Sequence, residues 1–444
     1  MSAEPSVPIT TVQRLLQRFA KVEPRESAAV IAAFFLFFFV LGSYFSVRPV
    51  RETIATLLGG DRVADLWLYT ALFSILIVPV YGWLLARVRR SVLLPWIYGV
   101  VALILGLLGA AIGTDEKNLA VGTFFYVWIS VLNLMLVSVF WSFLLEMFNS
   151  EQTKRLFGVI AAGGTLGALV GPAITGIFVK SVGNSGVLYI GTAGFVGAIL
   201  CQRLLIGIWN RRDATEAAAV VAAGGTAASL RSDKGLGGNP FAGILIVLKS
   251  PYLLGIALFV VLLSAVNTFL YFEQLRIVAD TFKDTARRTE VFASIDFVVQ
   301  ALTIFSQLFL TGRLASRLGV RSLLTLVPIA MIGGFLLLSA FNVFLMLAAL
   351  IVARRWGEYA FIRPGREMLF STLDTETKYK AKSFIDVPVY RAADFVGAQA
   401  KVAIEAAGTS PAGAALIGAG IAAAWAVNGW WLGRRHDNAE TAVK

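Results

Sequence analysis

The sequence has 444 residues, of which 57% are hydrophobic and only 15% are Asp, Glu, Lys or Arg. Soluble domains usually carry about 25% charged residues, so this composition excludes an ordinary soluble globular protein. The formal net charge is +12. We attribute it to basic loops at a membrane surface and not to a nucleic-acid-binding face.

Apolar runs long enough to cross a bilayer fall into two sets of six. A polar N-terminal segment comes first, and its residues 10–21 predict a short surface helix. The first set lies at 27–56, 64–86, 92–113, 119–147, 155–180 and 186–209. The second set lies at 251–281, 289–312, 321–341, 344–363, 383–407 and 411–433.

Between the sets, residues 210–240 are rich in Ala, Gly and charged side chains, which predicts a flexible cytoplasmic linker. A short interfacial helix is expected at 241–248. The predicted domains are a cytoplasmic segment, a six-helix bundle, a linker, a second bundle and a tail, at 1–25, 26–209, 210–250, 251–434 and 435–444. The expected fold class is an all-α membrane protein of about 12 transmembrane helices in two six-helix pseudo-repeats.

Basic residues recur in the loops after alternate spans, at Arg87, Arg89, Arg90, Lys154, Arg155, Arg313, Arg317, Arg321, Arg434 and Arg435. The positive-inside rule therefore predicts that these loops and both termini face the cytoplasm of a bacterial inner membrane.

Three short segments recur at equivalent places in the two halves. ARVRRSVLL (86–94) aligns with SRLGVRSLL (316–324), and SEQTKRLFGVI (150–160) aligns with DTETKYKAKSFI (374–385). RPVR (48–51) aligns with EQLR (273–276). A parallel repeat of six spans is the architecture of the major facilitator superfamily. The ARVRR loop is also similar to the loop signature of that superfamily, without its usual Asp.

Ionisable residues inside a bilayer are costly and usually functional or paired. The eleventh predicted span is the most polar, with Asp386, Arg391, Asp394, Lys401 and Glu405. The last four fall broadly on one helical face. One interpretation is a ladder of ion pairs, Arg391 with Asp394 and Lys401 with Glu405. The other is a face that lines water or substrate, which we favour for Asp386 and Arg391 together with Lys382.

Spans 8 and 10 carry further polar positions. In span 8, residues Asp296, Gln300, Thr303 and Gln307 share one face, which predicts either interhelical hydrogen bonds or a cavity wall. In span 10, Arg354 is spaced for a pair with Glu358 and lies near the bilayer centre by the helical rise. A central arginine is a candidate for binding an anion, and the repeat places Asn133 of span 4 at the matching position.

Spans 1 and 7 end in charges at equivalent heights. Arg48 and Arg51 are one turn apart and are candidates to clamp an anion together, although snorkelling to the surface is the simpler alternative. Glu52 follows in span 1, and Glu273 and Arg276 occupy the corresponding end of span 7.

The sequence has one cysteine, Cys201, and one histidine, His436, which limits the reactions that its side chains could catalyse. An internal disulfide is impossible, and a Cys/His metal site is not expected. His436 falls in the predicted polar tail, so a nucleophile activated by histidine is not expected. The Gly-rich segment 161–176 is followed by no Gly-Lys-Ser/Thr, so it is not a P-loop. It predicts a helix that packs closely through small residues. We expect no enzyme, no metal and no cofactor.

Three segments resemble the nucleotide transporters of plastids and intracellular bacteria. In the segment at 139–167 the similar residues are Phe140, Trp141, Glu151, Lys154, Arg155, Phe157 and Gly158. In the segment at 47–54 they are Arg48, Arg51 and Glu52. In the segment at 363–387 they are Pro364, Glu367, Met368, Leu373, Asp374, Lys378, Lys382, Ile385 and Asp386. The resemblance implies a major-facilitator-like fold and either exchange of ATP for ADP or proton-coupled nucleotide import.

The chain departs from that family at two acidic positions. The family's fourth span carries an acid before the Phe-Trp pair, whereas Leu119 to Leu145 holds no charge. The family also carries an acidic residue in span 7, and the only acidic residue near that position here is Glu273. Ala381 stands where the family has a glycine before the lysine that matches Lys382. A divergent member with another substrate would show such changes.

The first functional hypothesis is a monomeric secondary transporter of a small anionic metabolite, most simply a nucleotide, within the lipid bilayer and without nucleic acid. The expected substrate-binding residues are Arg48, Arg51, Asn133, Arg276, Arg354, Lys382 and Arg391. The expected gating or proton-coupling residues are Glu52, Glu273, Asp296, Glu358, Asp386 and Asp394. The alternatives are a proton-coupled exporter or lipid translocator on the same fold, and a membrane sensor or assembly partner that transports nothing.

Overall fold

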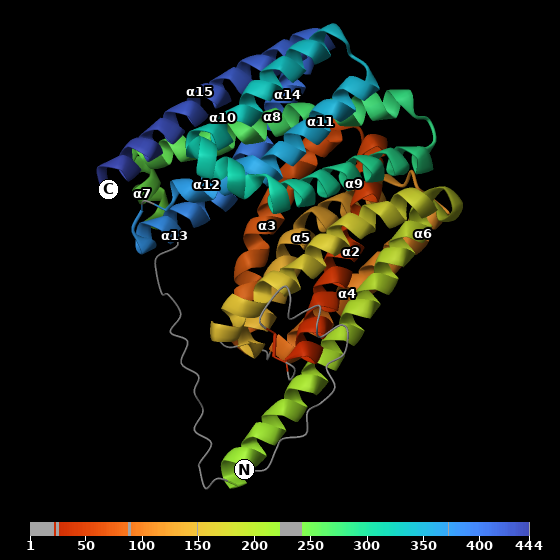
Figure 1. Ribbon diagram of the computed structural model, residues 1–444. Helices are drawn as coiled ribbons and strands as arrows, with labels where there is room; N and C mark the ends of the chain where they lie inside the picture. The colour runs from red at the N-terminus through yellow and green to blue at the C-terminus, as the bar shows by residue number, and fades with distance from the viewer. Residues whose placement is uncertain are drawn as a thin grey trace. The chain divides into compact units, whose positions relative to one another are not determined.

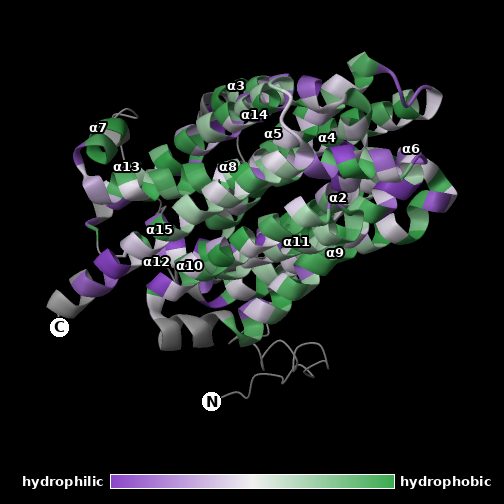
Figure 2. Cartoon of the chain, turned by 90° about the horizontal axis from the view of Figure 1, so that it is seen from above, coloured by the Kyte–Doolittle hydropathy of each residue, from purple (hydrophilic) through white to green (hydrophobic). Residues whose placement is uncertain are grey.

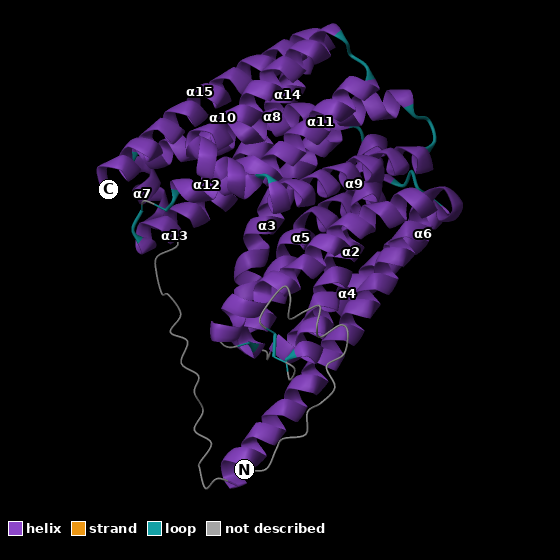
Figure 3. Cartoon of the chain, viewed as in Figure 1, coloured by secondary structure: helices purple, strands orange, loops and turns teal. Residues whose placement is uncertain are grey.

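A computed structural model describes residues 22–23, 26–87, 90–148, 150–222, 242–371 and 373–443. In this part of the chain the regular elements are α-helices and two short π-helical turns, joined by loops (Figure 3). The predicted surface helix at 10–21 lies outside the described residues.

The helices of the first half follow the predicted spans (Figure 1). They are α2 (Ser27–Leu58), α3 (Gly60–Arg87), α4 (Arg90–Thr114), α5 (Leu119–Met147) and α6 (Ser150–Ala222). Gly183 breaks α6 with φ 68°, a conformation that glycine adopts at no steric cost. The break falls between the predicted spans 155–180 and 186–209, so α6 supplies two spans, as predicted.

The helices of the second half begin with α7 (Ala242–Lys249), which confirms the short helix expected at 241–248. Three long helices follow, α8 (Pro251–Thr281), α9 (Thr285–Phe309) and α10 (Thr311–Ala340). Span 10 is built from α11 (Phe344–Gly357), the π-turn η1 (Glu358–Ile362) and α12 (Arg363–Leu369). The helix α13 (Thr375–Phe384) leads into span 11, which consists of the π-turn η2 (Ile385–Val389) and α14 (Tyr390–Ala406), and span 12 is α15 (Pro411–Val443).

Side-chain caps fix where several of these helices begin. Ser250 accepts a hydrogen bond from the backbone N–H of Leu253 at 3.3 Å, and proline follows it in the first turn of α8. Asp284 caps α9 in the same way, and Asp374 caps α13.

Eight helices in the described part are long and apolar enough to cross a membrane. One of these eight is α6, which supplies two spans because it is broken at Gly183. With α3 and the two spans interrupted by π-turns, the molecule is an all-α membrane protein of about 12 spans in two pseudo-repeats. Apolar residues dominate these helices, as their green colour shows (Figure 2).

Two segments differ from expectation near their ends. Helix α6 continues to Ala222, into the predicted flexible linker, because 210–222 is rich in alanine, the strongest helix former. Helix α15 continues to Val443, so His436 does not lie in a free tail. It is buried, and its Nε2 lies 3.1 Å from the carbonyl oxygen of Met368.

Contacts divide the chain into two compact units. Unit 1 comprises Met1–Arg48, Ile77–Asp115 and Val131–Lys234, and unit 2 comprises Pro49–Leu76, Glu116–Ser130 and Gly235–Lys444. Unit 2 therefore combines the second half with the predicted outer ends of α2, α3 and α5. The division into bundles at 26–209 and 251–434 stays a prediction.

Within unit 1, glycines allow α6 to pack closely against α2. Gly163, Gly167 and Gly171 recur every fourth residue, and a Cβ on each would collide with the α2 backbone. Thr175 continues this contact, since its hydroxyl donates to the carbonyl oxygen of Ser46 at 2.7 Å. Close packing through small residues, as predicted for 161–176, is therefore confirmed.

We predict that Gly167→Ala destabilises the protein, because the added methyl would meet the carbonyl of Phe38 and the N–H of Gly42. Overpacking of this kind costs about 1–3 kcal/mol. Gly158→Ala is the matched control on the same helix, where nothing lies within 4 Å of the added Cβ. Thermal unfolding in detergent should show a lower midpoint for Gly167→Ala alone, and equal midpoints would contradict the packing.

Candidate functional site

The predicted site residues divide between the two units. Arg48 and Asn133 belong to unit 1, where the Arg48 guanidinium carbon lies 5.9 Å from the centre of the Phe45 ring and Asn133 is exposed on α5. All the other predicted site residues belong to unit 2. The roles expected for Arg48 and Asn133 stay predictions.

Glu358 is the centre of a charged cluster in unit 2. Its carboxylate lies 2.9 Å from Arg354 Nη1 and 3.1 Å from Arg363 Nη2, and its side chain is only 8% exposed. The Arg354–Glu358 pair confirms the i, i+4 spacing read in the sequence. Arg363 was not predicted, and it extends the pair to a carboxylate held between two guanidinium groups.

Asp394 adds a second carboxylate from span 11. Its Oδ1 accepts a hydrogen bond from Ser264 Oγ at 2.5 Å, and its Oδ2 lies 3.7 Å from Arg391 Nη1. The predicted Arg391–Asp394 pair is thus present, at long range. Asp394 also interacts electrostatically with Glu358 and Arg354, so spans 10 and 11 contribute to one group of charges. We call Arg354, Glu358, Arg363, Arg391 and Asp394 the central charge cluster.

The π-turn η1 explains how Glu358 and Arg363 of the cluster meet. Glu358 begins η1, and Arg363 follows it by five residues. In an α-helix such residues point in different directions, whereas the i, i+5 register of a π-turn brings them together. Proline lies just after η1, at Pro364, and within η2, at Pro388. Proline has no N–H to donate to the preceding turn, which favours such an interruption.

The central charge cluster has an excess of positive charge, because three guanidinium groups face two carboxylates. Arg363 is 56% exposed and Arg391 is 29% exposed at the side chain. An exposed guanidinium in a membrane span is expected to meet water and not lipid. The cluster therefore offers accessible positive charge within the spans, where an anion would be stabilised.

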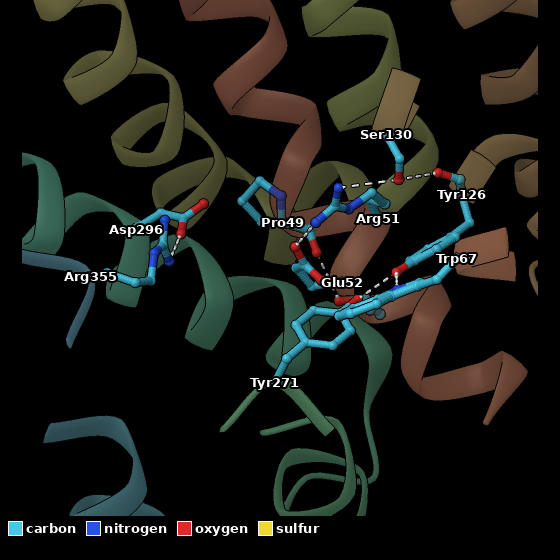
Figure 4. A network of polar contacts seen from close by, with 10 residues as sticks. Pro49, Arg51, Glu52, Trp67, Tyr126, Ser130, Tyr271, Asp296 and Arg355 are labelled. Atoms are coloured by element: carbon cyan, nitrogen blue, oxygen red, sulfur yellow. Dashed lines mark hydrogen bonds and ion pairs between the residues drawn. The ribbon is translucent and has the colours of Figure 1, made fainter. Parts of the chain in front are cut away.

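A second polar network surrounds Arg51 and Glu52 at the predicted outer end of span 1 (Figure 4). The two side chains form an ion pair, and Arg51 Nη1 also donates to Ser130 Oγ at 3.3 Å. The Arg51 guanidinium carbon lies 5.5 Å from the centre of the Tyr126 ring. Arg51 is therefore held by a carboxylate, a hydroxyl and an aromatic face.

Aromatic hydroxyls link this network to span 7 (Figure 4). Trp67 Nε1 donates to the hydroxyl of Tyr126 at 2.8 Å, and that hydroxyl lies 3.0 Å from the hydroxyl of Tyr271. Sequence reasoning missed all three residues because an uncharged aromatic side chain in an apolar span carries no signal of its own. Their buried polar tips are the feature that needs partners.

Lys401 joins span 11 to span 7. Its Nζ lies 2.9 Å from Glu273 and 2.7 Å from Glu405, and the side chain has no exposed surface. Glu273 also pairs with Arg276 at 2.6 Å. The predicted Lys401–Glu405 pair is confirmed as part of a network in which Lys401 and Arg276 meet three carboxylates, those of Glu273, Glu405 and the exposed Asp280. Arg276 is therefore already paired with a carboxylate.

Asp296 pairs with Arg355 across α9 and α11, and both are buried (Figure 4). The next residue of α11, Trp356, donates from its Nε1 to Ser306 Oγ of α9 at 2.7 Å. Thr303 is buried and Gln307 is exposed. Of the two alternatives for span 8, interhelical bonding is thus present at Asp296. The gating role expected for Asp296 stays a prediction.

Ion pairs also connect α12 with the segment after it. Lys382 Nζ lies 2.6 Å from Glu367, and Arg366 lies 3.0 Å from Asp386. Lys382 and Asp386 were both predicted from the sequence, but each has a partner from α12 and not from its own helix. Their expected roles in binding and gating stay predictions.

The motif residues of span 4 pack inside unit 1. Phe140 stacks on Phe37 with ring centres 4.0 Å apart, and Trp141 lies 5.0 Å from Phe157. Arg155 lies 2.9 Å from Glu26 at the start of α2. Burial acts to raise the pKa of Glu26, but hydrogen bonds from Gln152 and Arg155 outweigh it and hold that pKa below its usual range. These positions therefore hold α2, α5 and α6 together.

The fold is that of known membrane transporters of the major facilitator type. The structure of the nucleoside transporter NupG matches with a TM-score of 0.61 at 14% identity over 92% of this chain and 99% of that one. A POT family transporter in complex with a thioalcohol-conjugated peptide matches with a TM-score of 0.58 at 11% identity, over 90% and 94%.

A third solved structure is a bacterial homologue of the human lysosomal transporter Spinster. It matches with a TM-score of 0.52 at 14% identity, over 94% of this chain and 97% of that one. No family model and no curated protein sequence matches the chain. These likenesses establish the fold.

We predict that Glu358→Ala strongly destabilises the protein, because it leaves Arg354 and Arg363 without their shared carboxylate. Removal of one partner from a buried ion pair costs about 3–5 kcal/mol. Asp280→Ala is the control, since Asp280 is 70% exposed and lies 3.9 Å from Arg276. Such surface pairs contribute about 0–1 kcal/mol. Equal free energies of unfolding for the two variants would contradict the account.

Proposed function

We propose that the protein is a secondary active transporter that moves an anionic metabolite, a nucleotide, by alternating access. The excess positive charge of the central charge cluster is the observation that carries this proposal. Guanidinium groups bind phosphate through two parallel hydrogen bonds, which suits Arg363 and Arg391 as contacts for a phosphate group. The likeness of the fold to a nucleoside transporter supports a small solute of this size.

The cations of the cluster differ in how firmly they are held. Arg354 is buried and pairs with Glu358 on the next turn, so we assign it to setting the positive potential. Arg363 and Arg391 are more exposed, and we assign them to direct contact with the substrate. Lys382 and Arg51 would have to exchange their carboxylate partners, Glu367 and Glu52, for substrate phosphate. Such exchange between ion pairs is how gating would be linked to binding.

Asp394 is the residue that we assign to coupling. Glu358 has two guanidinium groups within 3.1 Å, whereas the nearest cation recorded for Asp394 is 3.7 Å away. Its short contact is with the neutral hydroxyl of Ser264. Of the two carboxylates, Asp394 is therefore the one that can take up a proton at the smaller electrostatic cost. Buried carboxylates near the middle of a span serve as proton relays in transporters.

The test is labelled ATP uptake into proteoliposomes loaded with unlabelled ADP, with and without an imposed pH gradient. We expect uptake by the unaltered protein and a roughly 10- to 100-fold loss of uptake efficiency in Arg391→Gln and Arg363→Gln, since a charged hydrogen bond is worth about 1.5–3 kcal/mol. Arg287→Gln is the control, because Arg287 is an exposed arginine paired with Glu290 at the start of α9. Circular dichroism and gel filtration check that each variant is folded.

The outcomes separate the proposed roles. Uptake that requires internal ADP indicates exchange, and uptake driven by the pH gradient and lost in Asp394→Asn indicates proton coupling. Unchanged uptake in both arginine variants would refute the cluster as the binding site. Folded protein without nucleotide uptake under either condition would favour the exporter, lipid-translocator or sensor hypotheses.

A further inference from the structure

A group of arginines and tryptophans lies where α10 and α15 meet, far in sequence from the central charge cluster. The guanidinium carbons of Arg321 and Arg434 lie 4.8 Å and 5.4 Å from the centre of the Trp430 ring. Arg435 lies 4.8 Å from the centre of the adjacent Trp431 ring. All three arginines are exposed.

The backbone holds this group in place. A Cβ at Gly433 would collide with the Cα of Arg321, so the glycine lets α15 touch the start of the apolar part of α10. Trp431 packs in turn against Gly255 at the start of α8. The Trp431 ring is thus anchored to the bundle, while the Trp430 ring and the guanidinium groups lie on its surface.

The group has one carboxylate close by, that of Asp437, which lies beside Gly319 of α10. Among the described residues, Arg321, Arg434 and Arg435 form no ion pair, and their recorded charge contacts are with the tryptophan rings. The neighbouring Asp437 lies 3.8 Å from His436 Nδ1. Arg321 and Arg434 share one aromatic ring, so both positive charges lie around the same tryptophan. A bound anion would relieve their repulsion.

The depth of the group matches a membrane surface. Trp430 follows the start of α15 by about 30 Å of helical rise, which is the thickness of the hydrocarbon core. The apolar span of α10 begins at Gly319, two residues before Arg321. Hydrophilic residues, purple in Figure 2, gather at this end of α15. Tryptophan is enriched at this level of the bilayer, and basic pockets between helices bind lipid head groups there.

We infer that Arg321, Arg434 and Trp430, flanked by Arg435, form a binding site for the head group of an anionic phospholipid of the predicted cytoplasmic leaflet. The two guanidinium groups would bind the lipid phosphate, and the tryptophan would pack along the glycerol and the first acyl carbons. This site is separate from the proposed transport site and does not depend on its substrate.

The experiment uses the full chain purified in detergent and titrated with phosphatidylglycerol or phosphatidylcholine, with bound lipid counted by native mass spectrometry. We expect specific retention of phosphatidylglycerol. Its affinity should fall about fivefold for each arginine removed, in Arg321→Gln, Arg434→Gln and the double variant. Arg203→Gln is the matched control, because Arg203 is an exposed arginine on α6 that contacts no aromatic ring among the described residues.

Three results would overturn the site. They are equal affinity for the anionic lipid in the double variant and the unaltered protein, equal retention of phosphatidylcholine, and displacement of the lipid by an equal concentration of inorganic phosphate. Arg321→Lys/Arg434→Lys guards against loss of folding. It keeps both charges and should keep most of the affinity, whereas a loss equal to that of the glutamine variant would contradict a site based on charge.

Discussion

Ions inside a membrane-spanning bundle must be paired, and this constraint determines how the helices of the second half are joined. A lone charge in a span is costly, so each buried ion needs an opposite charge or a hydrogen-bonding shell. Lys401 meets this requirement by joining span 11 to span 7 through Glu273. Asp296 meets it by joining span 8 to span 10 through Arg355. The ion pairs thus decide which helix faces touch.

The central charge cluster satisfies the same constraint with one cation in excess. Both π-turns lie beside the cluster, since η1 brings Arg363 to Glu358 and η2 immediately precedes the helix that carries Arg391 and Asp394. The two turns also interrupt the regular hydrogen bonding of spans 10 and 11, and π-turns of this kind frequently occur at functional sites. The exposed guanidinium groups of Arg363 and Arg391 are accessible to an anion. The physical account of the function is that a substrate phosphate supplies the missing negative charge.

Much of the architecture was predictable from the sequence, because the apolar runs mark the spans directly. The ends of α5 and α8 agree with the predicted 119–147 and 251–281. Local ion pairs, such as Arg354–Glu358, follow from helical spacing alone. Of the predicted linker, residues 210–222 are helical, because alanine propensity outweighed the linker composition in α6, and 223–241 lie outside the described residues. His436 was wrongly placed in a tail for a similar reason, since α15 stays helical.

The long-range partners were not predictable in the same way. Nothing in the spacing of span 8 identifies Arg355 as the partner of Asp296. Arg363 was missed because its contact with Glu358 exists only in a π-turn register. The hydroxyls of Tyr126 and Tyr271 meet through the packing of spans 4 and 7, which pattern analysis of one span does not reveal. Tertiary packing, and not local propensity, selects these contacts.

In the proposed mechanism the protein recognises its substrate by negative charge. The most direct measurement compares the uptake of labelled ATP with that of labelled adenosine into the same ADP-loaded proteoliposomes, since the two share a base and a sugar and differ in phosphate. Recognition by charge predicts that labelled ATP is taken up, that unlabelled ATP inhibits this uptake, and that excess adenosine leaves it unchanged. Adenosine uptake at an equal or higher rate would contradict it and would assign the cluster to another task.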